Sequence, residues 1–161
     1  VEYPATPKQA MSDFINVSMF SGGGGLVSTA MDYMIFAESL RNGGIYNGQR
    51  ILSSKTIKFM TKNHFESVIK PFEGGDMNFL KKSNSDGFGW GIGFGLVTES
   101  TKKGIIGSDG EYYWSGPSSI FWVDPTEDIV VVSMIQIMNA PFNRRSDIKI
   151  ATYQAIKESY E

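Results

Sequence analysis

Apolar residues recur at helical spacing after the glycine run at residues 22–25. Thr29 and Asp32, three positions apart, resemble a capping box at the start of this stretch, and Gly43 follows its end. With 3.6 residues a turn, one face carries the apolar stripe Ala30, Tyr33, Met34, Ala37 and Leu40. The pattern predicts a capped helix whose apolar stripe belongs to the core.

The next segment predicts a hairpin followed by a second helix. Asn47 and Gly48 supply the two positive-φ positions of a type I′ turn within residues 45–52. Ser53 is a suitable N-cap for the helix that follows, and Leu52 before it can pack against Ile57 as a hydrophobic staple. We expect this helix to end near residues 63–64 and residues 66–85 to form a long polar loop.

Glycine alternates with large apolar residues over residues 87–96. At the period of two that a strand imposes, one face carries only glycine and the other only bulky side chains. This pattern predicts one strand with its apolar face in the core; the alternative is that its aromatic residues form a platform for a ligand. Its glycine face allows close approach by another backbone or a helix.

Alternating and continuous apolar runs then predict strands at about 105–107, 111–115, 118–123 and 128–136. Residues 129–135 are apolar on both faces apart from Ser133, which predicts a central strand covered on each side. A last helix over about 146–159 would place Ile148, Ala151, Tyr153, Ala155 and Ile156 against the sheet. The order predicts an α+β domain, an antiparallel sheet flanked by helices, over residues 21–161 after an extended lead-in at 1–20.

Composition narrows the class of function. The 161 residues are 41% hydrophobic and 20% charged, with a formal net charge of −2, so we expect neither a nucleic acid nor an anionic membrane as partner. The sequence has no cysteine, which excludes disulfides and thiolate catalysis. The single histidine, His64, is expected at the surface or at a helix C-terminus, so we expect no metal site and no cofactor. No apolar run has the length of about 20 residues that a membrane-spanning helix needs.

Candidate chemistry centres on Trp114-Ser115-Gly116, which precedes the apolar run at residues 118–125. A hydroxyl side chain followed by glycine at a sheet edge lets a substrate backbone lie against the strand, because glycine has no side chain to hold it off. The alternative is an aromatic residue packed beside a turn. The glycines at residues 22–25 also suggest a phosphate loop, but no Lys-Ser or Lys-Thr pair follows them.

The sequence resembles the serine β-lactamase-like superfamily of class C β-lactamases, DD-peptidases and esterases. The resemblance is carried by the glycine run with its helix, by Trp114-Ser115-Gly116 and by the run 121–125. The resemblance implies the C-terminal part of a serine hydrolase that acts on an ester or amide. It places Trp114, Ser115 and Gly116 in the substrate-binding third motif, and Trp in the first position looks more like the esterase branch. The nucleophile, its Lys and the motif Tyr would lie in a missing N-terminal half, so no catalytic residue is expected here.

Two departures from the family pattern leave an alternative open. The one Ser-x-x-Lys, at Ser67 to Lys70, is followed by Pro71, which removes Lys70 from the helical region and argues against a catalytic pair. Pro117 stands where the family donates an oxyanion-hole N–H, and proline has none. The rival hypothesis is therefore a non-catalytic binding module that keeps the fold.

The resemblance also implies partners and a location. We expect a small-molecule or peptide-like ester or amide substrate, the missing half of the protein, and a possible homodimer through an unpaired sheet edge. Family resemblance alone suggests a periplasmic or secreted protein.

Overall fold

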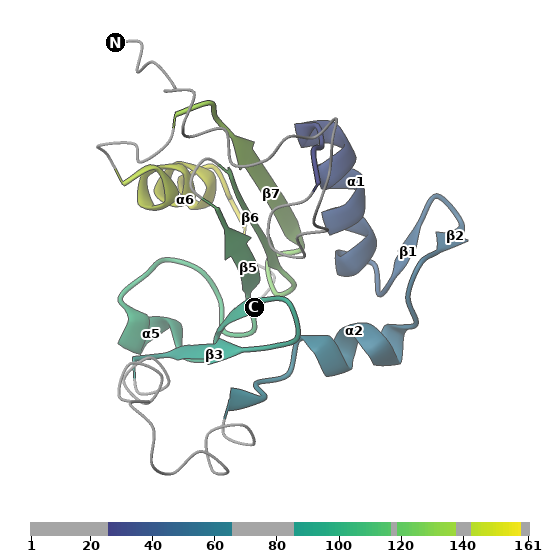
Figure 1. The fold of residues 1–161 in the computed structure, drawn as a ribbon. Coiled ribbons are helices and arrows are strands. Elements are labelled where there is room, and N and C mark those ends of the chain that lie inside the picture. The colour runs from purple at the N-terminus through teal and green to yellow at the C-terminus, as the bar shows by residue number, and fades with distance from the viewer. Residues whose placement is uncertain (1–25, 66–85, 117–118, 138–142, 159–161) are drawn as a thin grey trace, which may run out of the picture.

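The computed structural model describes residues 26–65, 86–116, 119–137 and 143–158. Five antiparallel strands form one sheet in the order β3-β4-β5-β6-β7 (Figure 1). Their bounds are Phe88–Trp90, Gly95–Val97, Tyr112–Ser115, Ser119–Asp124 and Ile129–Met134. Helices α1 (Ala30–Arg41) and α2 (Ser54–Met60) contribute to the core on one face of this sheet, and α6 (Arg144–Gln154) contributes on the other. The arrangement confirms an α+β domain with an antiparallel sheet flanked by helices.

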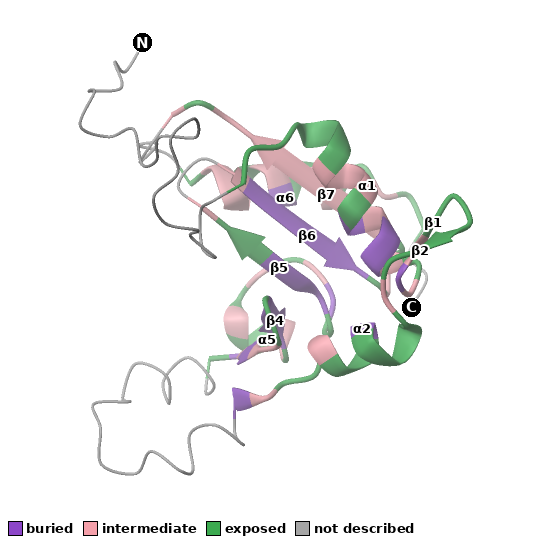
Figure 2. Cartoon of the chain, turned by 45° about the vertical axis from the view of Figure 1, so that its right-hand side comes forward, coloured by how far each residue is buried: buried purple, intermediate pink, exposed green. Residues whose placement is uncertain are grey.

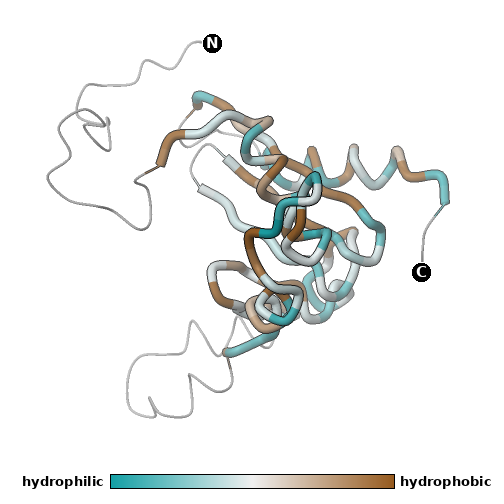
Figure 3. Tube along the Cα trace, turned by 90° about the vertical axis from the view of Figure 1, so that its right-hand side faces the viewer, coloured by the Kyte–Doolittle hydropathy of each residue, from teal (hydrophilic) through white to brown (hydrophobic). Residues whose placement is uncertain are grey.

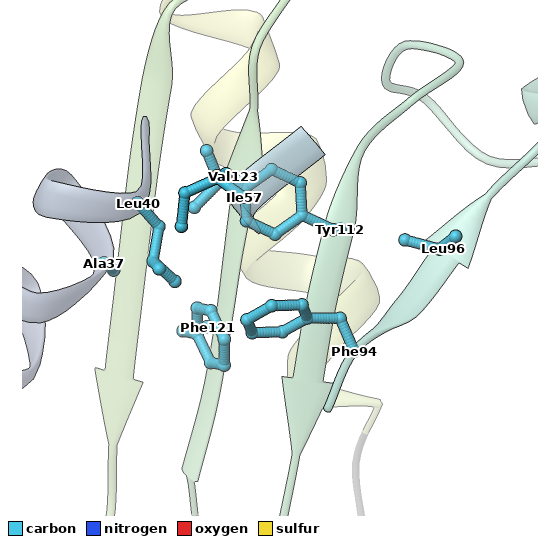
Figure 4. Close-up of a cluster of buried hydrophobic side chains, with 8 residues drawn as sticks. All are labelled: Ala37, Leu40, Ile57, Phe94, Leu96, Tyr112, Phe121 and Val123. Atoms are coloured by element: carbon cyan, nitrogen blue, oxygen red, sulfur yellow. The ribbon is translucent and has the colours of Figure 1, made fainter. Parts of the chain in front are cut away.

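The two faces of β5 and β6 build two cores. Tyr112 and Phe121 pack with Ala37 and Leu40 of α1, and Figure 4 shows this cluster between the helix and the sheet. On the opposite face a second cluster, which Ile148 of α6 joins, consists of Val97, Tyr113, Ile120 and Trp122. The residues of β6 are buried from Ile120 to Asp124 (Figure 2) because helices cover both of its faces.

The first three predicted elements are present with their predicted caps. The Thr29 side chain accepts a hydrogen bond from the Asp32 amide at 3.1 Å, and Ser53 accepts from the Thr56 amide at 3.0 Å. The hairpin of β1 (Ile45–Tyr46) and β2 (Gln49–Arg50) turns at Asn47 and Gly48, whose φ angles are 45° and 77°. Two details were wrong. Ala30 is exposed, and α2 ends at Met60, because Thr61 already leaves the helix as its C-cap.

The single strand predicted over residues 87–96 is instead a hairpin. Gly93 has a φ of 83°, the Gly91 amide donates to the Phe94 carbonyl at 2.9 Å, and the intervening Ile92 is 48% exposed. The predicted close approach at glycine is confirmed: a Cβ on Gly91 would collide with the Met60 carbonyl, and one on Gly95 would collide with the Tyr113 ring. A turn inside the glycine run therefore converts one long strand into β3 and β4.

Two further strand predictions were wrong. Residues 105–107 form no strand. They follow the short helix α5 (Ser100–Lys103), whose first amide donates to the Asp109 side chain at 2.7 Å. Gly104, at a φ of 64°, ends it. Strand β7 is covered on each side as predicted, but in the described sheet it is the last strand rather than a central one, paired only with β6, and its residues are half-buried. Its apolar character follows from this cover, since Val130 and Val132 pack on one core and Val131 on the other.

The inward face of α6 is centred on a charged residue. Lys149 is only 4% exposed and forms an ion pair with Glu111, which is fully buried just before β5. The Tyr153 hydroxyl donates to Asp124, whose carboxylate also accepts from the Ser108 amide at 3.1 Å. The predicted contacts of Ala151 and Ala155 with the sheet were wrong. Both alanines are exposed, because α6 turns Lys149 and Tyr153 toward the sheet to reach these carboxylates.

No helix among the described residues combines the length and the apolar character that a membrane span requires.

Candidate active site

Strand β5 leaves the core at its C-terminal end. Tyr112 and Tyr113 are buried, whereas Trp114 is 46% exposed and Ser115 is also exposed. Figure 2 shows the change along the strand, from buried at its start to exposed at its tip. Pairing with β6 continues to the end, where Ser115 lies opposite Ile120. The backbone of this exposed segment is therefore fixed by the sheet while its side chains are accessible to a ligand.

A tight connection follows the strand. The Gly116 amide donates to the Ser119 carbonyl at 2.8 Å, which closes the turn between β5 and β6. A Cβ on Gly116 would lie 3.4 Å from the Ser119 hydroxyl oxygen, an ordinary van der Waals contact. Pro117 lies between these residues and outside the described part of the chain.

A second tryptophan, which we did not predict as a site residue, lies beside Trp114. The rings of Trp90 and Trp114 meet edge to face, with centroids 5.6 Å apart and planes at 66°. The indole N–H of Trp90 is buried and finds no acceptor among the described residues. Trp90 lies in the alternating run for which packing was the prediction and an aromatic ligand platform the alternative. Its place immediately before the turn of the β3–β4 hairpin brings it to Trp114.

The segment after α2 fixes the backbone of Trp90. The Trp90 amide donates to the Asn63 side chain at 3.2 Å, and its carbonyl accepts from the His64 amide at 2.8 Å. The His64 ring nitrogen Nε2 lies 2.7 Å from the Phe59 carbonyl in the last turn of α2. The predicted placement of His64 at a helix C-terminus is confirmed.

Ser115 is exposed at the end of β5, and the described residues around it do not activate its hydroxyl as a nucleophile. Within this part of the chain, no lysine, histidine or carboxylate forms a hydrogen bond with the Ser115 hydroxyl, which such a nucleophile needs. Burial raises the pKa of Tyr112 and of Tyr113, so both phenols stay protonated at neutral pH and neither is a base. The described chain also contains no group of three residues placed to hold a metal ion.

Five sequence predictions lie outside the described residues. They concern the lead-in at residues 1–20, the glycines at residues 22–25, the long polar loop at residues 66–85, the Ser67 to Lys70 motif, and Pro117. They remain predictions.

Comparison with known proteins gives a family and a fold. The Beta-lactamase family model matches residues 1–155. Two curated proteins of Mycobacterium tuberculosis, Protein Rv1367c (strain ATCC 25618 / H37Rv) and Uncharacterized protein MT1414 (strain CDC 1551 / Oshkosh), are each 30% identical over 123 residues, or 74% of this chain. Among solved structures, "EstCE1, a hydrolase with promiscuous acyltransferase activity" matches 82% of this chain with a TM-score of 0.60 at 23% identity. The chain spans 29% of the curated relatives and 31% of EstCE1.

Proposed function

The chain belongs to the beta-lactamase family, and from this premise we propose that it is the C-terminal part of a serine hydrolase that cleaves an ester or amide through an acyl-enzyme. The observation that carries the proposal is the exposed end of β5, where Trp114 and Ser115 lie on a backbone fixed by β6. The structural neighbour EstCE1 combines hydrolysis with acyl transfer. Both reactions follow from one acyl-enzyme, which passes its acyl group to water or to another nucleophile.

The proposed roles follow from the chemistry of each side chain. Ser115 has a hydroxyl at the strand end but no neighbouring base among the described residues, so it binds the substrate or the leaving group. The nucleophile and its base come from a part of the protein that this chain does not include. Trp114 provides no cation to attract a carboxylate, and with Trp90 it forms an apolar wall. This wall favours a neutral, apolar acyl group as substrate.

We expect substitutions at the strand end to separate binding from specificity. In the intact protein, Ser115→Ala should lower kcat/KM by about tenfold, the value of one lost hydrogen bond. Trp114→Ala should mainly change preference, reducing kcat/KM for a p-nitrophenyl octanoate relative to the acetate by about tenfold through lost apolar contact. Ile51→Ala, an exposed residue on the β1–β2 hairpin side of the fold, is the matched control and should change neither value. If the unmodified protein and all three variants have equal activity and the same preference, the substrate binds elsewhere on the protein.

One observation favours the rival function, a binding module without turnover. Pro117 cannot donate a backbone N–H at the position after Gly116. Under this alternative, the intact protein binds an ester or amide but releases no product. Assays of the intact protein with p-nitrophenyl esters and with nitrocefin decide between the two, since turnover of either substrate supports the hydrolase.

We further propose that the rest of the protein pairs with β7. This strand has one neighbour in the described sheet, and an exposed strand edge recruits another strand. Leu26 and Val27, at the start of the described chain, are apolar and exposed at 95% and 73%. In Figure 3 the tube is coloured as hydrophobic where it follows the grey N-terminal trace.

The unpaired edge predicts association when the 161-residue chain is prepared alone. Light scattering should then report a dimer or larger species, whereas the intact protein should not need a second copy to cover this edge. A stable monomer of the isolated chain, with β7 amides protected from hydrogen exchange, would contradict the proposed pairing.

A further inference from the structure

A cleft of about 480 Å³ lies between β3, α5 and α6, on the α6 side of the sheet. Its volume is in the range of small-molecule sites. None of the residues that line it belongs to the strand end at Trp114. Strand β3 is also at the opposite edge of the sheet from β7, so the cleft lies away from the edge where we place the rest of the protein.

The lining of this cleft is positively charged. Lys103 comes from the end of α5, and Arg145 and Lys149 come from α6, while no aspartate or glutamate is among the lining residues. Lys149 already has a counter-ion in Glu111. Lys103 and Arg145 form no ion pair with any carboxylate in the described part of the chain. Neither cation therefore has a carboxylate in ion-pair contact, although the buried Glu111 carboxylate acts electrostatically on both.

Aromatic rings hold both of these cations in place. The Lys103 ammonium lies 3.8 Å from the centroid of Phe88 and 4.3 Å from that of Tyr113, and it hydrogen-bonds to the Tyr113 hydroxyl at 3.3 Å. The Arg145 guanidinium lies 3.7 Å from the centroid of Tyr113. Such contacts fix the position of a cation but leave its net charge uncompensated. The Nη2 nitrogen of Arg145 is buried without an acceptor among the described residues, so donor capacity remains unused.

Burial without a counter-ion affects the protonation of Lys103. Burial, together with the positive charge of Arg145, lowers the pKa of Lys103 to about 7. Lys149 acts in the same direction, whereas Glu111 acts in the opposite one. The Tyr113 phenol is neutral. An anion bound beside Lys103 would favour its charged form and would itself bind better when Lys103 is protonated.

Apart from Asn143 and Ser146, the uncharged side chains that line the cleft are apolar. Phe88 and Ile105 form part of the wall, and Ile106 and Ile150 line it while remaining 46% and 44% exposed. Inorganic anions such as phosphate gain nothing from these surfaces. A ligand with a hydrocarbon body covers them and gains the free energy of apolar burial.

We propose that this cleft binds a small monocarboxylate with an apolar body, its carboxylate between Lys103 and Arg145 and its hydrocarbon against Phe88, Ile106 and Ile150. The argument is independent of the proposed hydrolase activity, because it uses no residue of the strand end.

Titration calorimetry of the intact protein with sodium octanoate tests the proposal. Octanoate should bind, and Lys103→Gln or Arg145→Gln should each weaken binding by about tenfold or more, the effect of losing one charge-assisted hydrogen bond. Lys103→Arg keeps the charge and should bind within a few-fold of the unmodified protein. Lys102→Gln is the matched control, because its exposed neighbouring ammonium pairs with Glu99 and does not line the cleft. Thermal unfolding of each variant verifies that it is folded.

Titrations with two further ligands identify which part of octanoate is recognised. Octanol, without the charge, and inorganic phosphate, without the hydrocarbon, should each bind at least about tenfold more weakly than octanoate. Octanoate should bind several-fold more tightly at pH 6 than at pH 8.5, and Lys103→Gln should lose this dependence. No binding of octanoate, unchanged binding in both folded glutamine variants, or equal binding of phosphate would overturn the proposal.

Discussion

Replacing Lys149 with methionine is expected to lower the free energy of unfolding of the intact protein by about 3–5 kcal/mol. The substitution leaves the carboxylate of Glu111, which is fully buried, without its positive partner. A buried charge that loses its partner keeps its full desolvation cost, and this cost exceeds the attraction that the pair provided. Urea denaturation measures the difference.

Two variants separate the charge effect from packing. The double variant Lys149→Met with Glu111→Gln removes both charges and should recover most of the loss. Lys102→Met removes an exposed pair with Glu99 and should change stability by about 1 kcal/mol or less. If Lys149→Met is no more destabilising than Lys102→Met, the ion pair does not hold α6 to the sheet.

The loss of stability caused by Lys149→Met should depend on pH in a defined direction. Burial raises the pKa of Glu111, and the charge of Lys149 opposes that rise. Without Lys149 the folded-state pKa of Glu111 rises further. A raised folded-state pKa means that stability is retained at low pH and lost as pH rises through that pKa. The deficit of Lys149→Met should therefore shrink on acidification, when Glu111 becomes protonated.

In the intact protein, Pro117→Ala is expected to raise kcat for an activated ester by about tenfold or more. The family places an oxyanion-hole amide directly after the motif glycine, and alanine restores the N–H that proline lacks. Loss of one such donor typically costs about a hundred- to a thousand-fold in rate, which leaves room for this recovery.

Another proline provides the matched control for this substitution. Pro125 is exposed in the connection between β6 and β7, and Pro125→Ala should leave kcat unchanged. Thermal unfolding is needed for both variants because replacing proline changes the entropy of the unfolded chain. An unchanged kcat in a folded Pro117→Ala variant would mean that the oxyanion donor lies elsewhere, and Trp114-Ser115-Gly116 would no longer be the site.

Local signals in the sequence were sufficient for the starts of α1 and α2 and for the first hairpin, but not for α5 or for the inward face of α6. The caps at Thr29 and Ser53 and the Asn47-Gly48 turn depend on residues within a few positions, and each is present. The apolar pattern could not place β7 at an edge, because β7 packs on two cores and has the composition of a central strand. Nor could a period of two reveal the turn at Gly93, since the alternation continues through it.

Contacts between distant segments explain what was missed around the candidate site. Trp90 meets Trp114 only because the β3–β4 hairpin brings it there, 24 positions earlier in the chain. The burial of Lys149 depends on Glu111, 38 positions away. Neither pairing leaves a periodic signal. An isolated lysine on the apolar face of a predicted helix is nevertheless a reason to search for a buried carboxylate.

Covalent labelling of the intact protein with a fluorophosphonate, followed by peptide mapping, tests the central claim most directly. The account predicts one modified serine, in a Ser-x-x-Lys motif outside these 161 residues, with Ser67 and Ser115 unmodified. The 161-residue chain alone should be neither labelled nor active on p-nitrophenyl esters or nitrocefin. A label on Ser67 or Ser115, or turnover by the isolated chain, would contradict the proposal that the nucleophile lies elsewhere in the protein.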